Sequence, residues 1–365
     1  MNNTTEKALF KLLHIALEGD KNYAIPKQVN WEALLELSSA QGVIAIALDG
    51  LQRIVDADKE EEFEKDKQMM MFLYNMIGLS LSIENTSKSQ YESAKKLSNL
   101  WAENDIRTLV LKGMAFGSYY PNPYHRQCVD MDCYLCGKYE EGNVVIERKG
   151  INVTKEDYRH STFFFDNLHV ENHKICTTVR GRRQRKKFEQ YLRQLLEKEP
   201  TTQIEDSRLE IPCAMFNALY FLQHAHRHFL RESITLRHIC DWAMILDKCG
   251  DDIDWQEFKN VAGKNDVLKF AESLTRLAYE VCGVRCDVFI SDYALQKQDR
   301  MLLDDCYAIA DNMIQYGNNF KAHCQMVKNM INKRWKYKYF SNYSYLAEII
   351  ISVWGVFFEK EPVLD

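Results

Sequence analysis

One block of short, β-branched runs interrupts a chain that is otherwise patterned as helices, and this block limits the fold to a single small β-sheet. The runs are residues 106–111, 129–135, 162–165 and 168–173. Each is short, apolar or alternating in character, and bounded by turn residues, as is typical of strands. The last two are separated by Asp166 and Asn167, a pair that favours a tight hairpin turn.

Helical periodicity fills the chain on both sides of this block. Before it, Leu9, Leu12, Leu13 and Leu17 recur at spacings of three and four, and residues 4–104 contain no strand pattern. After it, helices are predicted over residues 188–198, 212–230, 235–248, 255–262 and 267–282, followed by a C-terminal helical set. The sequence therefore predicts an α+β fold with an N-terminal helical region (1–104), a core with a small mixed β-sheet (105–200) and a C-terminal helical domain (201–365).

The overall charge does not favour a polyanionic partner. Lys and Arg number 47 against 52 Asp and Glu, so nucleic acid would need a local basic patch such as residues 180–187, and a solvated loop is the more frequent outcome for such a run. Eleven cysteines without framework spacing, and no signal-peptide pattern, indicate reduced thiols in a cytoplasmic protein. The apolar stretch 345–358 is shorter than the roughly 20 residues that span a bilayer, so we expect a buried helix and no membrane contact.

Candidate metal ligands lie on two of the predicted strands. Asp130 and Asp132 alternate with apolar residues, so their carboxylates project from one face with Cα atoms roughly 6.5–7 Å apart. His169, Glu171 and His173 share a face of the last strand in the same way. If the two strands are neighbours, Glu171 comes beside the aspartates. Three carboxylates can then hold the divalent ions that phosphoryl and nucleotidyl transfer use.

The turn before these acids has the features of a phosphate site. The first predicted strand ends at Lys112 and Gly113, which open a helical stretch, so backbone N–H groups and the lysine can face an anion. Arg126 can add a second cation. The alternative is structural: Lys112 can form a salt bridge at the sheet edge, and Arg126 can pair with Asp130 or Asp132.

These residues resemble a known signature. Leu109-Val-Leu-Lys-Gly-Met-Ala-Phe116, Tyr119-Tyr-Pro121, Arg126 and Val129-Asp-Met-Asp132 are similar to the Leu-Lys-Gly turn, Tyr-Pro, Arg and Asp-x-Asp of the uncharacterised nucleotidyltransferase family of the DNA polymerase beta superfamily. The family continues with an acidic residue two positions before a histidine, matched by Glu171 and His173. A later His-rich helix and an Arg…Asp pair match residues 224–228, Arg237 and Asp241, so the resemblance runs from about Trp31 to Trp242.

The resemblance implies a metal-dependent nucleotidyltransferase core within the small sheet. Asp130, Asp132 and Glu171 would be catalytic and would bind Mg²⁺ or Mn²⁺, while Lys112, Gly113, Arg126 and His173 would contact the nucleotide. The reaction would move a nucleoside monophosphate from an NTP to an acceptor (a small molecule, protein or RNA) and release pyrophosphate.

Two departures from the family pattern accompany the resemblance. The family usually has Asp where this chain has Glu171, and the segment between Leu135 and Thr162 is short for the helix and strand normally found there. Gly117 and Ser118 are an alternative for the Gly-Ser turn of the superfamily, although Lys112 and Gly113 directly follow a strand.

Other interpretations of the same motifs stay open. A catalytically silent member of the fold would bind nucleotide or a protein partner through its helices. A metal-dependent phosphohydrolase built on residues 224–241 is disfavoured, because no histidine there is directly followed by Asp.

The remaining chemistry-bearing residues have structural interpretations. His224, His226 and His228 have no carboxylate or cysteine at a spacing that completes a zinc site, which favours structure or substrate contact. Arg237 and Asp241 lie one helical turn apart, where an ordinary ion pair explains them. Cys133 and Cys136 have no second pair, so a zinc ribbon is disfavoured.

Overall fold

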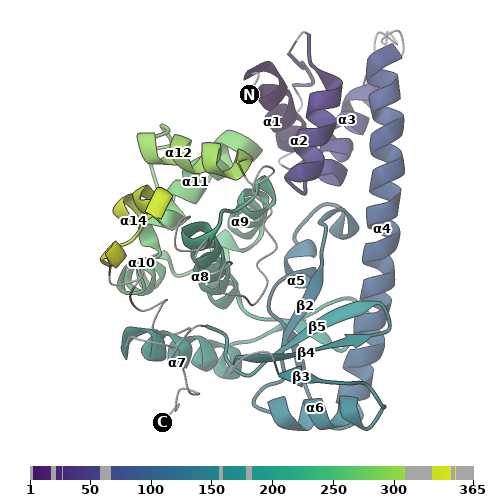
Figure 1. Ribbon diagram of the computed structural model, residues 1–365, viewed down its shortest axis with the longest axis vertical. Coiled ribbons are helices and arrows are strands. Elements are labelled where there is room, and N and C mark those ends of the chain that lie inside the picture. The colour runs from purple at the N-terminus through teal and green to yellow at the C-terminus, as the bar shows by residue number, and fades with distance from the viewer. Residues whose placement is uncertain are drawn as a thin grey trace.

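The computed structural model shows an α+β protein in which one mixed sheet is surrounded by helices (Figure 1). It describes residues 3–17, 22–26, 28–57, 67–155, 159–177, 183–308, 331–346 and 350. The fold class predicted from the sequence is confirmed. None of the described helices is long and apolar enough to cross a lipid bilayer.

The N-terminal region consists of helices, as predicted. They are α1 (Asn3–Leu17), α2 (Trp31–Ala40), α3 (Ile44–Ala57) and α4 (Lys67–Ala102). Helix α4 has 36 residues, a length of about 54 Å at 1.5 Å per residue. It runs along one side of the molecule, with α1–α3 packed near one end and the sheet near the other (Figure 1).

Seven strands form one mixed sheet in the order β3-β4-β5-β2-β1-β7-β6. They are β1 (Thr108–Val110), β2 (Asp130–Tyr134), β3 (Thr154–Lys155), β4 (His160–Phe165), β5 (Leu168–His173), β6 (Thr202–Gln203) and β7 (Leu209–Ile211). Strands β4 and β5 form the predicted hairpin, and Asp166 in its turn has a left-handed φ of 51°. Strand β5 also pairs with β2 in parallel, which makes the two acidic strands neighbours.

The two faces of the sheet pack on different helices. On one face Met131, Cys133 and Val170 are buried with Trp101 of α4 and Ile146 of α6 (Tyr139–Glu147). On the other face Leu109 and Tyr134 join the larger core, which also contains Phe216 and Tyr220 of α8 (Ala214–Arg231). Because side chains alternate along a strand, Asp130 and Asp132 lie on the face that is turned toward α8.

Short elements near the sheet complete the core. Helix α5 (Met114–Gly117) and the 3₁₀ turn η2 (Pro123–His125) lie between β1 and β2. The described helices after β5 are α7 (Arg183–Lys198), α8, α9 (Leu236–Cys249), the 3₁₀ turn η3 (Gly250–Asp252), α10 (Trp255–Lys264), α11 (Leu268–Cys282), α12 (Lys297–Tyr307) and α14 (Arg334–Phe340). The helices predicted over residues 188–282 are therefore confirmed.

Two expectations about the core were wrong. The segment between Leu135 and Thr162 does hold a helix and a strand, α6 and β3, because a tight turn with positive φ at Cys136 and Gly137 leaves room for them. The region after residue 200 is not purely helical, because β6 and β7 extend the sheet beyond β1. Strands of two and three residues are too short to show a period of two in the sequence.

Three other expectations concern segments or residues that the structure describes only in part: the basic run, the apolar stretch and the cysteines. Residues 180–182 of the basic run and most of the apolar stretch 345–358 lie outside them. The ten cysteines within the described residues form no disulfide bond, and Cys133, a buried residue of β2, belongs to no cluster of metal-ligating side chains among those residues.

Candidate active site

The register between β2 and β5 brings the predicted acidic residues together. Asp132 is paired with Glu171 across the two strands, and Asp130 is paired with His169. Ligand atoms of Asp130, His169 and Glu171 lie within 4.8 Å of one another, and so do those of Asp132, Glu171 and His173. Glu171 belongs to both groups, so the three carboxylates cluster around one point as the sequence predicts.

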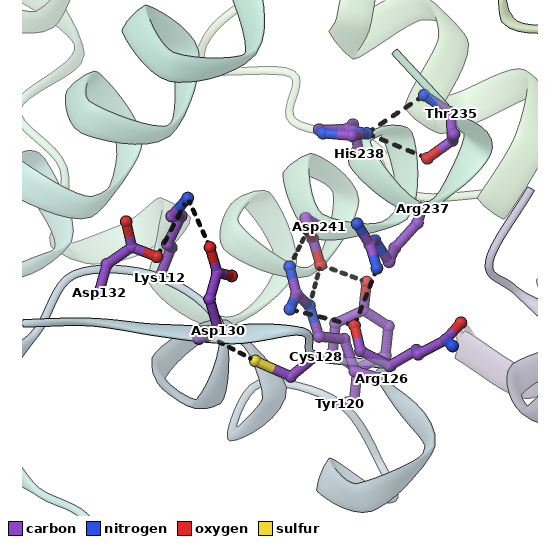
Figure 2. A network of polar contacts seen from close by, with 11 residues as sticks. Lys112, Tyr120, Arg126, Cys128, Asp130, Asp132, Thr235, Arg237, His238 and Asp241 are labelled. Atoms are coloured by element: carbon purple, nitrogen blue, oxygen red, sulfur yellow. Dashed lines mark hydrogen bonds and ion pairs between the residues drawn. The ribbon is translucent and has the colours of Figure 1, made fainter. Parts of the chain in front are cut away.

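Two cations offset most of the negative charge of this cluster. The Lys112 Nζ lies 3.0 Å from Asp132 Oδ2 and 4.0 Å from Asp130 Oδ2, so its ammonium is held by both aspartates (Figure 2). On the other side, His173 Nε2 lies 2.9 Å from Asp132 Oδ1 and 3.4 Å from Glu171 Oε2. The structural alternative for Lys112, a salt bridge at the sheet, is therefore present in the structure.

The surroundings shift the pKa values of Asp130 and Asp132 in opposite directions. Burial raises the pKa of Asp130, and the neighbouring charge of Asp132 raises it further. Burial also acts to raise the pKa of Asp132, but Lys112 and His173 outweigh it and lower that pKa. Burial acts to lower the pKa of His173, but the Asp132 and Glu171 carboxylates raise it to about 9. At neutral pH, His173 is therefore an imidazolium that shares its charge with two acids.

Helix α8 forms the opposite wall of this site. A cavity of about 240 Å³ is lined by the three carboxylates, Lys112 and His173 from the sheet side and by Tyr220, Gln223, His224, Arg227 and His228 from α8. These five positions recur at spacings of three and four, so they form one stripe of the helix. The rest of the lining consists of Arg159, His160, Cys176 and Thr177.

A buried glutamate on α7 positions one edge of this cavity. The carboxylate of Glu189, which is 1% exposed, accepts hydrogen bonds from the backbone N–H groups of Cys176 and Thr177 at 3.0 and 2.8 Å. Both of these residues line the cavity. The loop that follows β5 is thus fixed by α7.

The histidines of α8 divide into two kinds. His224 and His228 line the cavity, with ring centroids 4.5 Å apart. Burial lowers the pKa of His224, and Lys112 lowers it further, so this imidazole is neutral at physiological pH. His226 instead lies in the core, where its Nε2 is 2.9 Å from the Phe340 carbonyl oxygen. For His226 the structural interpretation is correct.

Gly113 has a conformation that other residues adopt only with strain. Its φ is 64°, and a Cβ atom there would lie 2.8 Å from Cys128 Sγ and 3.0 Å from the Asp130 carbonyl oxygen. The turn thus brings Lys112 up to β2. The helix that follows it, α5, has only four residues, so a helix dipole adds little to anion binding here. Gly117 and Ser118 line a different cavity.

Arg126 lies away from the carboxylate cluster. Its Nε and Nη2 donate hydrogen bonds to the two Asp241 oxygens at 3.0 and 2.7 Å, and the Tyr120 hydroxyl donates another to Oδ1 at 2.8 Å (Figure 2). Asp241 therefore pairs with Arg126 and not mainly with its helix neighbour Arg237, whose Nη1 donates to the Gln127 carbonyl oxygen at 3.0 Å. The structure does not bring Arg126 into the cavity that holds the acids.

The sequence of the chain identifies its family. The family model described as an uncharacterised nucleotidyltransferase matches residues 27–283, more than half of the chain. The chain belongs to the uncharacterised nucleotidyltransferase family. Comparisons with curated proteins and with solved structures find no match. Membership of this nucleotidyltransferase family indicates transferase activity, and the clustered acids and histidines have the composition of a metal site.

Several residues of the site were not identified from the sequence. Arg159, Tyr220 and Gln223 line the carboxylate cavity but belong to no recognised motif, and Arg227 was not singled out within residues 224–228. The signal for three of them was present, since Tyr220, Gln223 and Arg227 fall on the same helical stripe as His224. The packing of that stripe against the acidic strands could not be predicted from the sequence.

The raised pKa of His173 predicts a specific dependence of stability on pH. Its pKa of about 9 in the folded protein exceeds the value of 6.5 for an unperturbed histidine, so its pairing stabilises fully below pH 6.5 and is lost as pH rises through 9. Relative to His173→Gln, the metal-free wild type should lose on the order of 3 kcal/mol of stability over this window. Urea denaturation with a chelator at several pH values measures this.

A second buried histidine provides the control. The pKa of His226 is lowered by burial to about 4, so it is neutral across the same window. The destabilisation caused by His226→Gln should therefore not change with pH there. An equally flat difference for His173→Gln would show that His173 is not charged in the folded protein.

Proposed function

We propose that the protein is a metal-dependent nucleotidyltransferase that moves a nucleoside monophosphate from an NTP to an acceptor and releases pyrophosphate. The observation that carries this proposal is the convergence of Asp130, Asp132 and Glu171 from two neighbouring parallel strands into one cavity, in a chain of a nucleotidyltransferase family. Carboxylates in this arrangement suit phosphoryl chemistry because they hold hard divalent ions.

The donor set fits Mg²⁺ or Mn²⁺. Asp130, Asp132 and Glu171 offer carboxylate oxygens, the ligands that both ions prefer, and His169 adds a nitrogen atom at the edge of the cluster. When bound, such ions would neutralise the triphosphate and lower the pKa of the attacking hydroxyl group. Lys112 holds positive charge at the same carboxylates, so it competes electrostatically with a cation there.

The phosphate groups have three basic residues to contact. Lys112, Arg159 and Arg227 line the same cavity as the carboxylates, from the sheet and from α8. Guanidinium and ammonium groups form strong charge-assisted hydrogen bonds with phosphate oxygens. We therefore assign the triphosphate to the space between β2 and α8, and we assign nucleotide contacts to Lys112, Arg227 and His173.

Glu171 is our candidate for the acceptor of the proton from the attacking hydroxyl. Burial acts to raise its pKa, but its contact with His173 lowers it, so Glu171 is ionised and able to accept a proton. His173 holds both Glu171 and Asp132, which restricts their orientation. The proton acceptor and the metal ligands are thus positioned by one imidazolium.

Removing a phosphate-binding cation should affect triphosphates more than nucleosides. We expect Lys112→Ala and Arg227→Ala each to weaken ATP binding by about tenfold to a hundredfold, while adenosine affinity changes little, because hydrogen bonds to charged groups contribute roughly 1.5–3 kcal/mol. Titration of ATP and adenosine against each protein with Mn²⁺ measures the ratio. Lys248→Ala, a lysine on the other cavity, is the control. An unchanged ATP-to-adenosine ratio in both variants would exclude these residues as phosphate ligands.

One observation favours the second candidate function, a catalytically silent nucleotide-binding protein. Lys112 already forms ion pairs with the two aspartates that a metal ion would use. Incubating the purified protein with each of the four NTPs, Mg²⁺ or Mn²⁺ and a panel of acceptors distinguishes the two functions. Release of pyrophosphate with labelling of an acceptor supports the transferase, and metal-dependent NTP binding without release supports the silent protein.

A further inference from the structure

A second and larger cavity lies on the other side of the turn that carries Lys112. Its volume is about 940 Å³, and its walls come from α4, α5, α7, the β6–β7 region, the start of α8 and α10. Lys112 lines the carboxylate cavity, whereas its neighbour Gly113 lines this one. The two cavities are therefore separated at this point by the backbone of a single turn.

The chemistry of this larger cavity is acidic. Five acidic residues line it, and none of them forms an ion pair with a cation among the residues that the structure describes: Glu199, Glu205, Asp252, Asp254 and Glu257. The two basic residues in the lining are already neutralised elsewhere. Arg126 pairs with Asp241 at 2.7 Å, and Lys248 pairs with Asp247 at 2.8 Å. The cavity therefore carries an excess of negative charge.

Two further features point to a bound small molecule. Gln90 lines the cavity, is 6% exposed, and its Oε1 has no hydrogen-bond partner within the described residues. An amide buried without a partner costs stability unless a ligand satisfies it. Four tyrosines also line the cavity, and tyrosine rings attract cations: Tyr91, Tyr119, Tyr124 and Tyr191.

We propose that this cavity binds a small organic cation that donates a hydrogen bond to Gln90. The five carboxylates in the lining attract such a cation and disfavour a triphosphate, so this site goes beyond the proposed nucleotidyltransferase function. A volume near 940 Å³ suits a small molecule, whereas the negative lining repels RNA.

A matched pair of sugars tests the charge requirement. Chitotriose carries three amines that are protonated at about pH 6, and its triacetylated form has nearly the same shape and no charge. We expect calorimetry without nucleotide or metal to show at least about tenfold tighter binding of chitotriose, with an affinity that falls between about 20 and 300 mM salt. Equal binding of the two sugars, or no binding of either, would overturn the proposal.

Charge variants localise the binding. The double variant Glu199→Gln/Glu257→Gln should remove most of the preference for chitotriose. The double variant Glu272→Gln/Glu280→Gln, which changes the net charge equally on α11 and outside the cavity, should keep the preference. An unchanged preference in the Glu199/Glu257 protein would place the binding elsewhere and overturn the proposal.

Discussion

Replacing Asp130 or Asp132 with asparagine is expected to abolish nucleotide transfer in both proteins but to change their stability in opposite directions. Each substitution removes one of the carboxylates proposed to hold the metal ions, so activity should fall by at least about a hundredfold. Stability should differ because the two carboxylates have different surroundings. The pKa of Asp130 is raised and that of Asp132 is lowered, so the charge is disfavoured at the first and favoured at the second.

The expected magnitudes follow from the partners of each aspartate. Asp132 is 1% exposed and pairs with both Lys112 and His173, so Asp132→Asn leaves two buried cations without their main partner and should cost roughly 3–5 kcal/mol. Asp130→Asn relieves repulsion from Asp132 and should be neutral or stabilising by up to about 1 kcal/mol. Urea denaturation of the metal-free proteins measures both.

A readout other than activity tests the metal assignment. Titration of Mn²⁺ by calorimetry should show weaker binding in both variants, including Asp130→Asn, whose fold is not compromised. Asp49→Asn is a suitable control because Asp49 is a partly buried acid that contacts His125 far from the cluster. Unchanged Mn²⁺ affinity in the Asp130→Asn protein would remove this residue from the metal site.

This contrast could not be predicted from the sequence. Two carboxylates on one strand face suggest mutual repulsion, which predicts that either asparagine leaves stability unchanged or raises it. For Asp130 the raised pKa supports the same prediction. For Asp132 that expectation neglects Lys112 and His173, whose approach depends on the positive φ of Gly113 and on the parallel pairing of β2 with β5. Neither the conformation of that turn nor the strand pairing is specified by a local pattern.

The parts of the fold that were predictable are those governed by local periodicity. The four longer runs in the sheet region gave strands, and alternation placed Asp130, Asp132 and Glu171 on the correct faces. The parts that were missed depend on tertiary packing. Helix α8 could be placed in the sequence, but the stripe that contains Gln223, His224 and Arg227 needed the packed structure to become the second wall of the cavity.

For Arg126 the sequence suggested a contact that the structure does not show. The sequence places it four residues before Asp130, which suggested a contact with phosphate or with the aspartates. Residues close in sequence need not share a cavity, and the η2 turn directs Arg126 toward α9, 115 residues further along the chain, where it meets Asp241. Its side chain is 8% exposed, and both oxygens of its partner are used.

The second large loss of stability is expected at the buried pair of Arg126 and Asp241. Asp241→Ala or Arg126→Ala should each destabilise the protein by roughly 3–5 kcal/mol, because each leaves the other charge buried without its partner. Burial acts to raise the pKa of Asp241, but Arg126 lowers it below 3.8, so the stabilisation is present above that pH and is lost as pH falls through the lowered pKa. Urea denaturation between about pH 3 and 7 measures both effects.

The double variant Arg126→Met/Asp241→Leu separates structure from nucleotide binding. Replacing both charges with apolar side chains removes the unpaired group, so much of the stability should return and the single-variant losses should not add. If Arg126 acts only through Asp241, the double variant should bind ATP as the wild type does. If Arg126 reaches the nucleotide in the bound state, ATP affinity should drop in the double variant while adenosine affinity stays constant. The first result is expected, since Arg126 donates to both Asp241 oxygens and lies outside the cavity that contains the three carboxylates.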